Sequence, residues 1–314
     1  IVVDASTGQV LMSDHADKQL HPASLTKMMT LLLAFDALSS GQLRTSDYIR
    51  VSKHAAAQSP SKLGIRSGGR IRVDDAIRAI AIKSANDISV AMAEALGETE
   101  SRFAQRMTAR AREIGMSKTH FVNASGLHSA FQLSTPRDMA VLARYIITTY
   151  PSYYKYFGLR SFNYAGRSHP NHNRLMSSYY GMDGMKTGFI NASGFNLVAS
   201  AKRDGRRLIG VVFGGRTAAS RNAHMAKILD TAFATPSIRP QPKIDVARIS
   251  RMPDRRSSRE TDRGEDFAAD DGAFDTTNPR DLARVRPESG SDETGSGDID
   301  MPRDTLIIRE KPIT

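Results

Sequence analysis

The chain has 314 residues, 40% of them hydrophobic, so it can form one large domain or two modest ones with a packed core. It contains no cysteine, which excludes thiol nucleophiles, cysteine zinc sites and disulfides. No run approaches the roughly 20 apolar residues that a membrane-spanning helix needs. Residues 1–235 hold 30 Lys+Arg against 16 Asp+Glu, an excess of 14. This basic body favours an anionic partner such as a cell-wall polymer, a membrane surface or nucleic acid, although charge also serves solubility alone.

The chain opens with two short predicted strands, Ile1–Val3 and Gln9–Met12, joined by a turn. Because it begins without a methionine and inside a predicted strand, we expect that a signal peptide has been removed. His21–Ser24 then leads into the apolar stretch Leu25–Phe35. Proline and serine are typical of helix starts, so a helix is predicted here.

The middle of the chain, roughly residues 35–150, is predicted to be mainly helical. Residues 74–96 have a helical pattern that is interrupted near Lys83–Asp87. Two further helices are predicted over Ser101–Ile114 and Thr135–Thr149.

The pattern returns to strands after residue 180. Gly184–Ile190 is one predicted strand, and Phe195–Lys202 and Arg206–Phe213 form a predicted hairpin whose arginine-rich tip faces solvent. Ala218–Ala234 is predicted as a closing helix. Strands at both ends with helices between them favour an α+β fold, in which an antiparallel sheet is closed by the two ends of the domain around a helical insertion.

The composition changes from about Pro236, where proline, serine, glycine, aspartate and arginine become dominant. Ser289–Asp300 is especially polar. Such a composition predicts a disordered tail or a linker. The expected organisation is therefore a folded domain over residues 1–235, with its helical part at about 35–150, followed by a disordered tail or linker over residues 236–314.

A serine–lysine pair at the first helix is the leading candidate for chemistry. A serine hydroxyl is inert at neutral pH unless a base removes its proton. Residues three apart share a helix face, so Ser24 and Lys27 place an amine beside a hydroxyl, and a helix N-terminus favours the alkoxide. Burial near other cations would lower the pKa of the lysine and make it a base. Ser-x-x-Lys also occurs at Ser59–Lys62 and Ser152–Lys155, but only Ser24 opens an apolar helix.

Two further short patterns narrow the choice. Ser84-Ala85-Asn86 falls at the predicted helix break, where side chains can project into a cleft, although Ser-x-Asn occurs twice elsewhere. Lys186-Thr187-Gly188 occurs once, on a predicted strand, and is the most specific of the three patterns. Each residue alone has an ordinary structural explanation, such as a helix cap for Ser24 or a strand bulge for Gly188. Their joint occurrence in this order favours catalysis.

The three patterns together resemble the signature of the penicillin-binding proteins and serine β-lactamases. Residues 1–235 resemble low-molecular-mass D-alanyl-D-alanine carboxypeptidases in several stretches: Ile1–Leu11, Pro22–Leu33, Phe121–Leu127, Ser134–Ala140, Phe195–Ser200 and Gly214–Arg221. The resemblance implies a β-lactamase/transpeptidase-like α+β fold. An antiparallel sheet flanked by helices would hold Lys186, a mainly helical subdomain would hold Ser84, and the active site would lie between them.

The resemblance also implies a role for each catalytic residue. Ser24 would attack the carbonyl of the penultimate D-alanine, and Lys27 would take its proton. Ser84 would relay a proton to the departing D-alanine, with electrostatic support from Lys186. The backbone N–H groups of Ser24 and Phe189 would form the oxyanion hole.

Substrate binding would involve four further positions. Asn86 would bind the peptide carbonyl, and Gly188 would let the substrate lie against the strand because it has no side chain. Thr187 and Arg221 would bind the terminal carboxylate, for which a planar guanidinium is suited. Arg216 is the competing candidate for that arginine.

The activity that the resemblance implies is removal of the terminal D-alanine from peptidoglycan pentapeptides through an ester on Ser24. β-Lactam antibiotics would be covalent inhibitors, with no metal, no organic cofactor and no nucleic acid involved. Because peptidoglycan lies outside the cytoplasmic membrane, the protein is expected to be periplasmic or exported. The family often has a C-terminal amphipathic anchor, and residues 236–314 show no convincing one, so membrane attachment stays open.

Other functions compete with this interpretation. A D,D-endopeptidase or transpeptidase would begin with the same acyl-enzyme, although the missing large domains of bifunctional synthases favour hydrolysis. A class A β-lactamase needs a glutamate for deacylation, and none lies between Glu113 and Glu260. A non-catalytic cell-wall binding module would not need an activated nucleophile. His169 and His172 suggest a metal site, but no third ligand is near and a polar loop is predicted.

Overall fold

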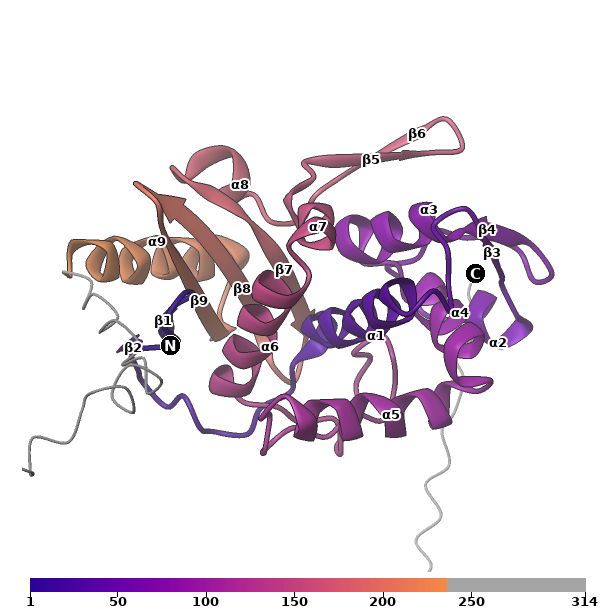
Figure 1. Ribbon diagram of the computed structural model, residues 1–314, viewed down its shortest axis with the longest axis horizontal. Helices are drawn as coiled ribbons and strands as arrows, with labels where there is room; N and C mark the ends of the chain where they lie inside the picture. The colour runs from indigo at the N-terminus through magenta and orange to yellow at the C-terminus, as the bar shows by residue number, and fades with distance from the viewer. Residues whose placement is uncertain (236–314) are drawn as a thin grey trace, which may run out of the picture. The chain divides into compact units, whose positions relative to one another are not determined.

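The computed structural model describes residues 1–235, which form a five-stranded sheet beside a helical part (Figure 1). Every neighbouring pair in the sheet is antiparallel, and the order is β2-β1-β9-β8-β7. The strands are β1 Val2–Asp4, β2 Val10–Met12, β7 Met182–Ile190, β8 Gly194–Arg203 and β9 Arg206–Gly215. The first two strands therefore join the last three across the helical insertion, which confirms the predicted closure of the sheet.

Three helices, which start at Glu100, Pro136 and Ala218, begin near the predicted positions, and a threonine side chain caps each of them. Thr99, Thr135 and Thr217 each accept a backbone N–H with the side chain, as helix N-caps do. The longer helices are α1 Lys27–Ser39, α4 Asn86–Gly97, α5 Glu100–Glu113, α6 Pro136–Thr149 and α9 Ala218–Ala234. The shorter ones are α2 Lys53–Ala56, α3 Val73–Arg78, α7 Pro151–Tyr154 and α8 Leu175–Ser178, with 3₁₀ turns at Ala23–Thr26 (η1) and Lys155–Gly158 (η3) and a π-helix at Ala79–Lys83 (η2).

Helices cover both faces of the sheet (Figure 1). Leu197 and Ala199 of β8 belong to one apolar cluster with Met225 and Leu229 of α9. Val198, which lies between them, belongs to the other cluster, which extends into the helical part. Successive residues of a strand point to opposite faces, so the strand joins two cores. The nearly continuous apolar run of β8 follows from burial on both sides.

Two small two-stranded sheets were not predicted from the sequence. β3 Tyr48–Arg50 pairs with β4 Arg70–Arg72, and β5 Ser161–Tyr164 pairs with β6 Arg167–Pro170. In the first pair only the central isoleucine of each strand is buried. Strands of three or four residues with at most one buried side chain have too little alternation to stand out from a loop.

The turn of the β8–β9 hairpin is exposed, but its three arginine side chains are partly buried and paired instead of solvated as predicted. Arg207 pairs with Asp183 at 2.7 Å, and Arg206 pairs with Asp4 at 3.3 Å. The Arg203 guanidinium lies 4.5 Å from the ring centroid of Tyr179. The prediction was wrong because these partners come from distant parts of the chain, which local turn chemistry does not reveal.

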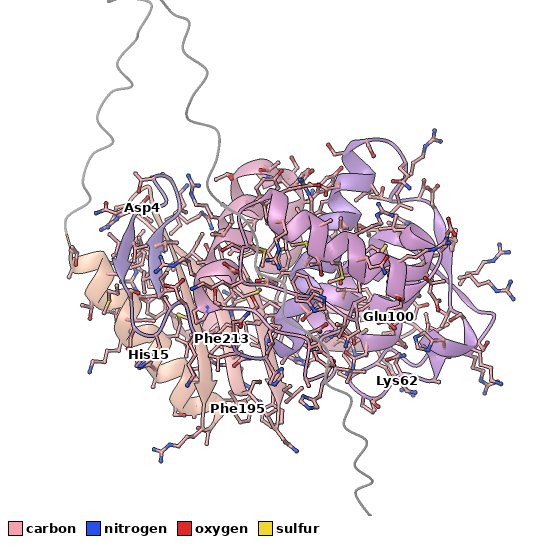
Figure 2. All side chains as sticks on the ribbon, turned by 90° about the horizontal axis from the view of Figure 1, so that it is seen from below. Asp4, His15, Lys62, Glu100, Phe195 and Phe213 are labelled. Atoms are coloured by element: carbon pink, nitrogen blue, oxygen red, sulfur yellow. The ribbon has the colours of Figure 1, made fainter. Side chains whose placement is uncertain are left out.

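Among residues 1–235, no helix is long and apolar enough to cross a bilayer. The predicted tail over residues 236–314 lies outside the described part of the chain. Figure 2 shows two of the labelled side chains, Lys62 and Glu100, in the helical part, and Phe195 and Phe213 on strands of the sheet. The site described next lies where the sheet meets the helical part.

Candidate active site

The turn that holds Ser24 is a 3₁₀ turn and not the first turn of the α-helix. η1 covers Ala23–Thr26, and Lys27 is the first residue of α1. In a 3₁₀ helix, side chains three residues apart eclipse each other, which suits a contact between Ser24 and Lys27 even better than an α-helix. Lys27 Nζ accordingly lies 3.0 Å from Ser24 Oγ.

The amine of Lys27 is fully buried and surrounded by acceptors. Nζ donates to Asn86 Oδ1 at 2.7 Å and to the Ser125 carbonyl oxygen. Since both of these oxygens can only accept, they occupy two N–H groups and leave the third position facing Ser24 Oγ. In a neutral amine that position is the lone pair, and the hydroxyl can donate its proton to it.

Burial and the neighbouring Lys186 favour this neutral form. Desolvation and then the charge of Lys186 lower the pKa of Lys27 well below its usual range, while Asp87 and Glu100 oppose the shift. Neither carboxylate forms an ion pair with Lys27 among the described residues, because each is engaged elsewhere. Asp87 accepts from the Leu63 and Gly64 N–H groups, and Glu100 accepts from the Ala124 N–H.

Ser84 is held in a strained backbone conformation. The π-helix η2 ends at this residue, whose φ of 60° and ψ of 39° are left-handed. Such values are uncommon for residues other than glycine, and π-turns and strained residues often occur at functional sites. The conformation turns the hydroxyl toward the sheet, where Lys186 Nζ donates to Ser84 Oγ at 2.9 Å.

Lys186 reaches Ser84 from strand β7. Its side chain is buried, and Nζ also contacts the Thr187 carbonyl oxygen at 3.1 Å. Burial, and then the charge of Arg221, lower its pKa from 10.5 to about 7. The site thus contains two hydroxyl–amine pairs, one on the helical side and one bridging to the sheet.

Asn86 and Asp87 hold in place the loop that lies on the side of the site opposite the sheet. The Asn86 backbone N–H donates to the Ser61 carbonyl at 2.7 Å, and its Nδ2 donates to the Ser59 carbonyl at 2.8 Å. Together with the Asp87 contacts, these bonds hold the loop over residues 59–64 against α4. The second Ser-x-x-Lys pair lies in this loop, but Lys62 donates to the Ala56 carbonyl and not to its serine.

Strand β7 lies directly against the nucleophile turn. A Cβ added to Gly188 would sit 3.2 Å from Ser24 N and 3.0 Å from the Pro22 carbonyl, tighter than ordinary contacts. Glycine permits this approach, which brings the backbone beside Phe189 toward the Ser24 N–H. The Phe189 ring is about half exposed and lies 4.3 Å, centroid to centroid, from Phe195.

A cavity of about 360 Å³ lies between the two parts. Lys27 and Lys186 lie buried beneath it, and the other predicted site residues line it: Ser24, Ser84, Asn86, Thr187, Gly188, Phe189 and Arg221. Arg221 is nearly buried, and it donates to the Asn196 carbonyl at 2.6 Å. Burial lowers its pKa to about 10. Arg216 is exposed and does not line this cavity, so the geometry favours Arg221 as the arginine of the site.

Comparison with known proteins identifies the family. The family model described as D-alanyl-D-alanine carboxypeptidase matches residues 1–217. The chain belongs to the D-alanyl-D-alanine carboxypeptidase family. A curated relative, D-alanyl-D-alanine carboxypeptidase DacF of Bacillus subtilis, is 38% identical over 239 residues, which are 74% of this chain and 61% of that protein. The chain therefore spans about three fifths of the length of the curated relatives it matches.

Solved structures of this carboxypeptidase family and its neighbours have the same fold. Penicillin binding protein 5 from Haemophilus influenzae matches with a TM-score of 0.72 and 33% identity, over 74% of this chain and 69% of that one. Penicillin-Binding Protein D2 from Listeria monocytogenes, in the ampicillin-bound form, matches with a TM-score of 0.65 and 28% identity, over 74% and 95%. The predicted transpeptidase-like α+β fold is confirmed.

Three residues of this carboxypeptidase-family site were not predicted. The Ser125 carbonyl accepts from Lys27, and Gly126 and His172 line the cavity. The resemblance over Phe121–Leu127 was a signal for the first two, but it gave no role. His172 was predicted to lie in a polar loop, and it lies exposed at the rim of the site. His169 lies on β6 beside Phe162, and residues 1–235 contain no group of three His, Asp or Glu that could hold a metal ion.

Replacing Gly126 by alanine tests how closely the loop over residues 123–126 supports the nucleophile turn. A Cβ there would lie 1.9 Å from the Ala23 carbonyl oxygen, and φ is +83°. We expect the variant to lose about 3 kcal/mol of stability and to acylate at least about tenfold more slowly. Gly115→Ala is the matched control, because its φ is +93° and it has open space around it. Equal losses of thermal stability in both variants would contradict the argument.

Proposed function

We propose that the chain is a serine D,D-carboxypeptidase, which hydrolyses the terminal D-Ala–D-Ala bond of peptidoglycan stem peptides through an ester on Ser24. One observation above all supports this: the amine of Lys27, buried and with a lowered pKa, lies 3.0 Å from Ser24 Oγ beneath an open cavity. A nucleophilic serine needs such a base within hydrogen-bonding reach. Residues 1–235 are then the catalytic domain.

The acylation step follows from the contact between Ser24 and Lys27. Ser24 Oγ gives its proton to neutral Lys27 Nζ and attacks the carbonyl carbon of the penultimate D-alanine. The backbone N–H groups of Ser24 and Phe189 stabilise the oxyanion, and Asn86 binds the preceding peptide carbonyl. Because two of the Lys27 N–H groups already have acceptors, the amine needs no reorientation to receive the proton.

Collapse of the tetrahedral intermediate depends on Ser84 and Lys186. The amide nitrogen leaves with a proton from Ser84 Oγ, and Lys186 Nζ, 2.9 Å away, stabilises the hydroxyl oxygen as the proton departs. Water then attacks the ester, the same groups move protons in the reverse direction, and Ser24 is regenerated. The acyl-enzyme is shared with endopeptidases and transpeptidases. The leaving group distinguishes an endopeptidase, and attack on the ester by an amine in place of water distinguishes a transpeptidase.

Replacing Arg221 by alanine tests binding of the terminal carboxylate. Arg221 lines the cavity with Thr187, and removing a buried guanidinium is expected to lower kcat/KM for peptides with a free C-terminal carboxylate by about a hundredfold. Hydrolysis of the corresponding C-terminal methyl ester is expected to fall far less. Arg216→Ala, which alters an exposed arginine outside the cavity, is the control. Equal losses on acid and ester would refute the role of Arg221.

β-Lactam antibiotics are proposed as covalent inhibitors that acylate Ser24. The Listeria relative is described in ampicillin-bound and cefotaxime-bound forms, which supports the proposal. Since the proposed substrate lies outside the cytoplasmic membrane, we also propose a periplasmic or exported location.

Incubation with benzylpenicillin, followed by intact mass, tests the proposed function. A persistent one-to-one adduct is expected on the parent and on Ser152→Ala, whose serine belongs to an exposed Ser-x-x-Lys, but not on Ser24→Ala. The parent should also release D-alanine from an acylated peptide that ends in D-Ala-D-Ala. Rapid consumption of the antibiotic without an adduct would indicate a β-lactamase. The absence of both an adduct and consumption of the antibiotic would refute the catalytic proposal.

A further inference from the structure

A second cavity, of about 490 Å³, adjoins the proposed active site. Its walls include Arg160, Asn171, His172, Asn173 and Arg174. His172 lines both cavities, so the two meet at its ring. The catalytic roles proposed above use nothing in this second cavity.

The second cavity opens on the leaving-group side of the scissile bond. Asn173, in the wall of the second cavity, donates to the carbonyl of Gly184, which lies on β7 two residues before Lys186. Lys186 is bonded to Ser84, which donates a proton to the departing nitrogen. Ile190, at the last residue of β7 and on the other side of Lys186 from Gly184, also lines the first cavity.

The chemistry of the second cavity favours an anionic group. Arg160 and Arg174 are exposed, and neither guanidinium makes an ion pair or a hydrogen bond with the described residues. No carboxylate is among the residues that line the cavity. Two free guanidinium groups in a cavity without acids attract carboxylates, which they can bind in a bidentate manner.

A buried acceptor in the same wall lacks a partner. Asn173 is 2% exposed, and its Nδ2 donates to the Gly184 carbonyl at 3.2 Å. Its Oδ1 is buried with no hydrogen-bond partner in the described part of the chain. Buried polar atoms are rarely left unpaired, so this amide oxygen still has the capacity to accept a hydrogen bond.

We infer that the second cavity is a subsite for leaving groups larger than alanine that have an acidic side chain. The inference rests on the proposed function and extends its substrate class. The bond broken is the amide between D-alanine and the larger residue; Ser24 takes the acyl group, and the released nitrogen takes the proton from Ser84. A cross-linked stem peptide presents a leaving group larger than alanine, because the nitrogen belongs to a second peptide and not to free D-alanine.

Three peptides with one acyl half test the subsite. Each is an N-acylated peptide ending in D-Ala-X, where X is D-alanine, D-glutamate or D-lysine. We expect the parent to cleave the D-glutamate peptide with a kcat/KM at least about tenfold above that of the D-lysine peptide. The double variant Arg160→Ala/Arg174→Ala is expected to lose this preference while cleaving D-Ala-D-Ala at the parent rate. Arg50→Ala/Arg70→Ala, which removes two exposed arginines from the β3–β4 sheet, is expected to change nothing.

The outcomes separate the subsite from the proposed function. If the parent forms the penicillin adduct and releases D-alanine but cleaves the D-glutamate and D-lysine peptides equally, the subsite alone is overturned. Equal losses on all three peptides in the Arg160→Ala/Arg174→Ala variant also overturn it, since the arginines would then support the fold or the common site. If the parent forms no adduct and releases no D-alanine, both proposals fail together.

Discussion

Replacing Lys27 by alanine is expected to lower the rate of acylation by benzylpenicillin about a thousandfold. The substitution removes the base that lies 3.0 Å from Ser24 Oγ, and general-base catalysis typically contributes 10² to 10⁴-fold. Intact mass recorded over time gives the rate. Lys155→Ala is the control, since Lys155 belongs to another Ser-x-x-Lys pair but is exposed. An unchanged rate in Lys27→Ala would remove this residue from the mechanism.

The pH profile separates loss of the base from damage to the fold. The pKa of Lys27 is lowered, so the amine is protonated and inactive at acidic pH and becomes a competent base as the pH rises through that pKa. The parent rate should therefore rise with pH along an acidic limb, and Lys27→Ala should lack that limb. A slow variant that keeps the limb would show that another group titrates, and thermal denaturation of both proteins checks that each is folded.

Replacing Lys186 by methionine is expected to stabilise the protein while lowering hydrolysis at least about a hundredfold. Burial and the charge of Arg221 lower the pKa of Lys186 from 10.5 to about 7. By linkage, the protonated amine disfavours folding by about 5 kcal/mol below pH 7. Methionine fills a similar volume and removes that cost, although Ser84 Oγ loses a donor. We expect a net gain of about 2 kcal/mol, or about 4–8 °C in Tm.

The pH dependence of stability tests the sign of this effect. The unfolded chain holds the Lys186 proton up to about pH 10.5, whereas the folded chain releases it near pH 7. The cost is therefore fully present below pH 7 and is relieved as the pH rises. Between pH 6.5 and 9.5 the parent should gain about 3 kcal/mol relative to Lys186→Met in denaturant unfolding. A difference that stays constant over this range would show that Lys186 is not destabilising.

The sequence was most informative where periodicity and caps agreed. α9 has the predicted bounds, Ala218–Ala234, and α5 differs from its prediction by one residue at each end. Both helices begin after a threonine that caps them, so the local signal was complete. The predicted helix at Leu25 begins two residues later, because the residues before Lys27 form a 3₁₀ turn. Propensity does not distinguish these two kinds of turn.

The sequence could predict only those parts of the site that depend on the identity of a side chain within a short pattern. The three short patterns were recognised together through a family resemblance, since nothing local places Ser84 beside Lys186, 102 residues later. The Ser125 carbonyl was missed because the resemblance over Phe121–Leu127 marked the segment but not the role of a backbone oxygen, which does not depend on the side chain. The pairing of Arg207 with Asp183 was missed because it depends on how β7 and β9 lie relative to each other. Such tertiary contacts override what a turn alone predicts.

The pairing of β1 with β9 has a consequence for the order in which the chain folds. Val3 lies opposite Ile209, so this pair of strands closes a loop of roughly 200 residues. Contacts within the helical part are much more local and are expected to form earlier. β1 is thus made long before β9 and is among the last strands to take its place in the sheet, and β9 keeps an unpaired edge until β1 pairs with it. Amide exchange in β9 should become slow only in this final step, and a nascent chain would be most prone to wrong strand pairing during that wait.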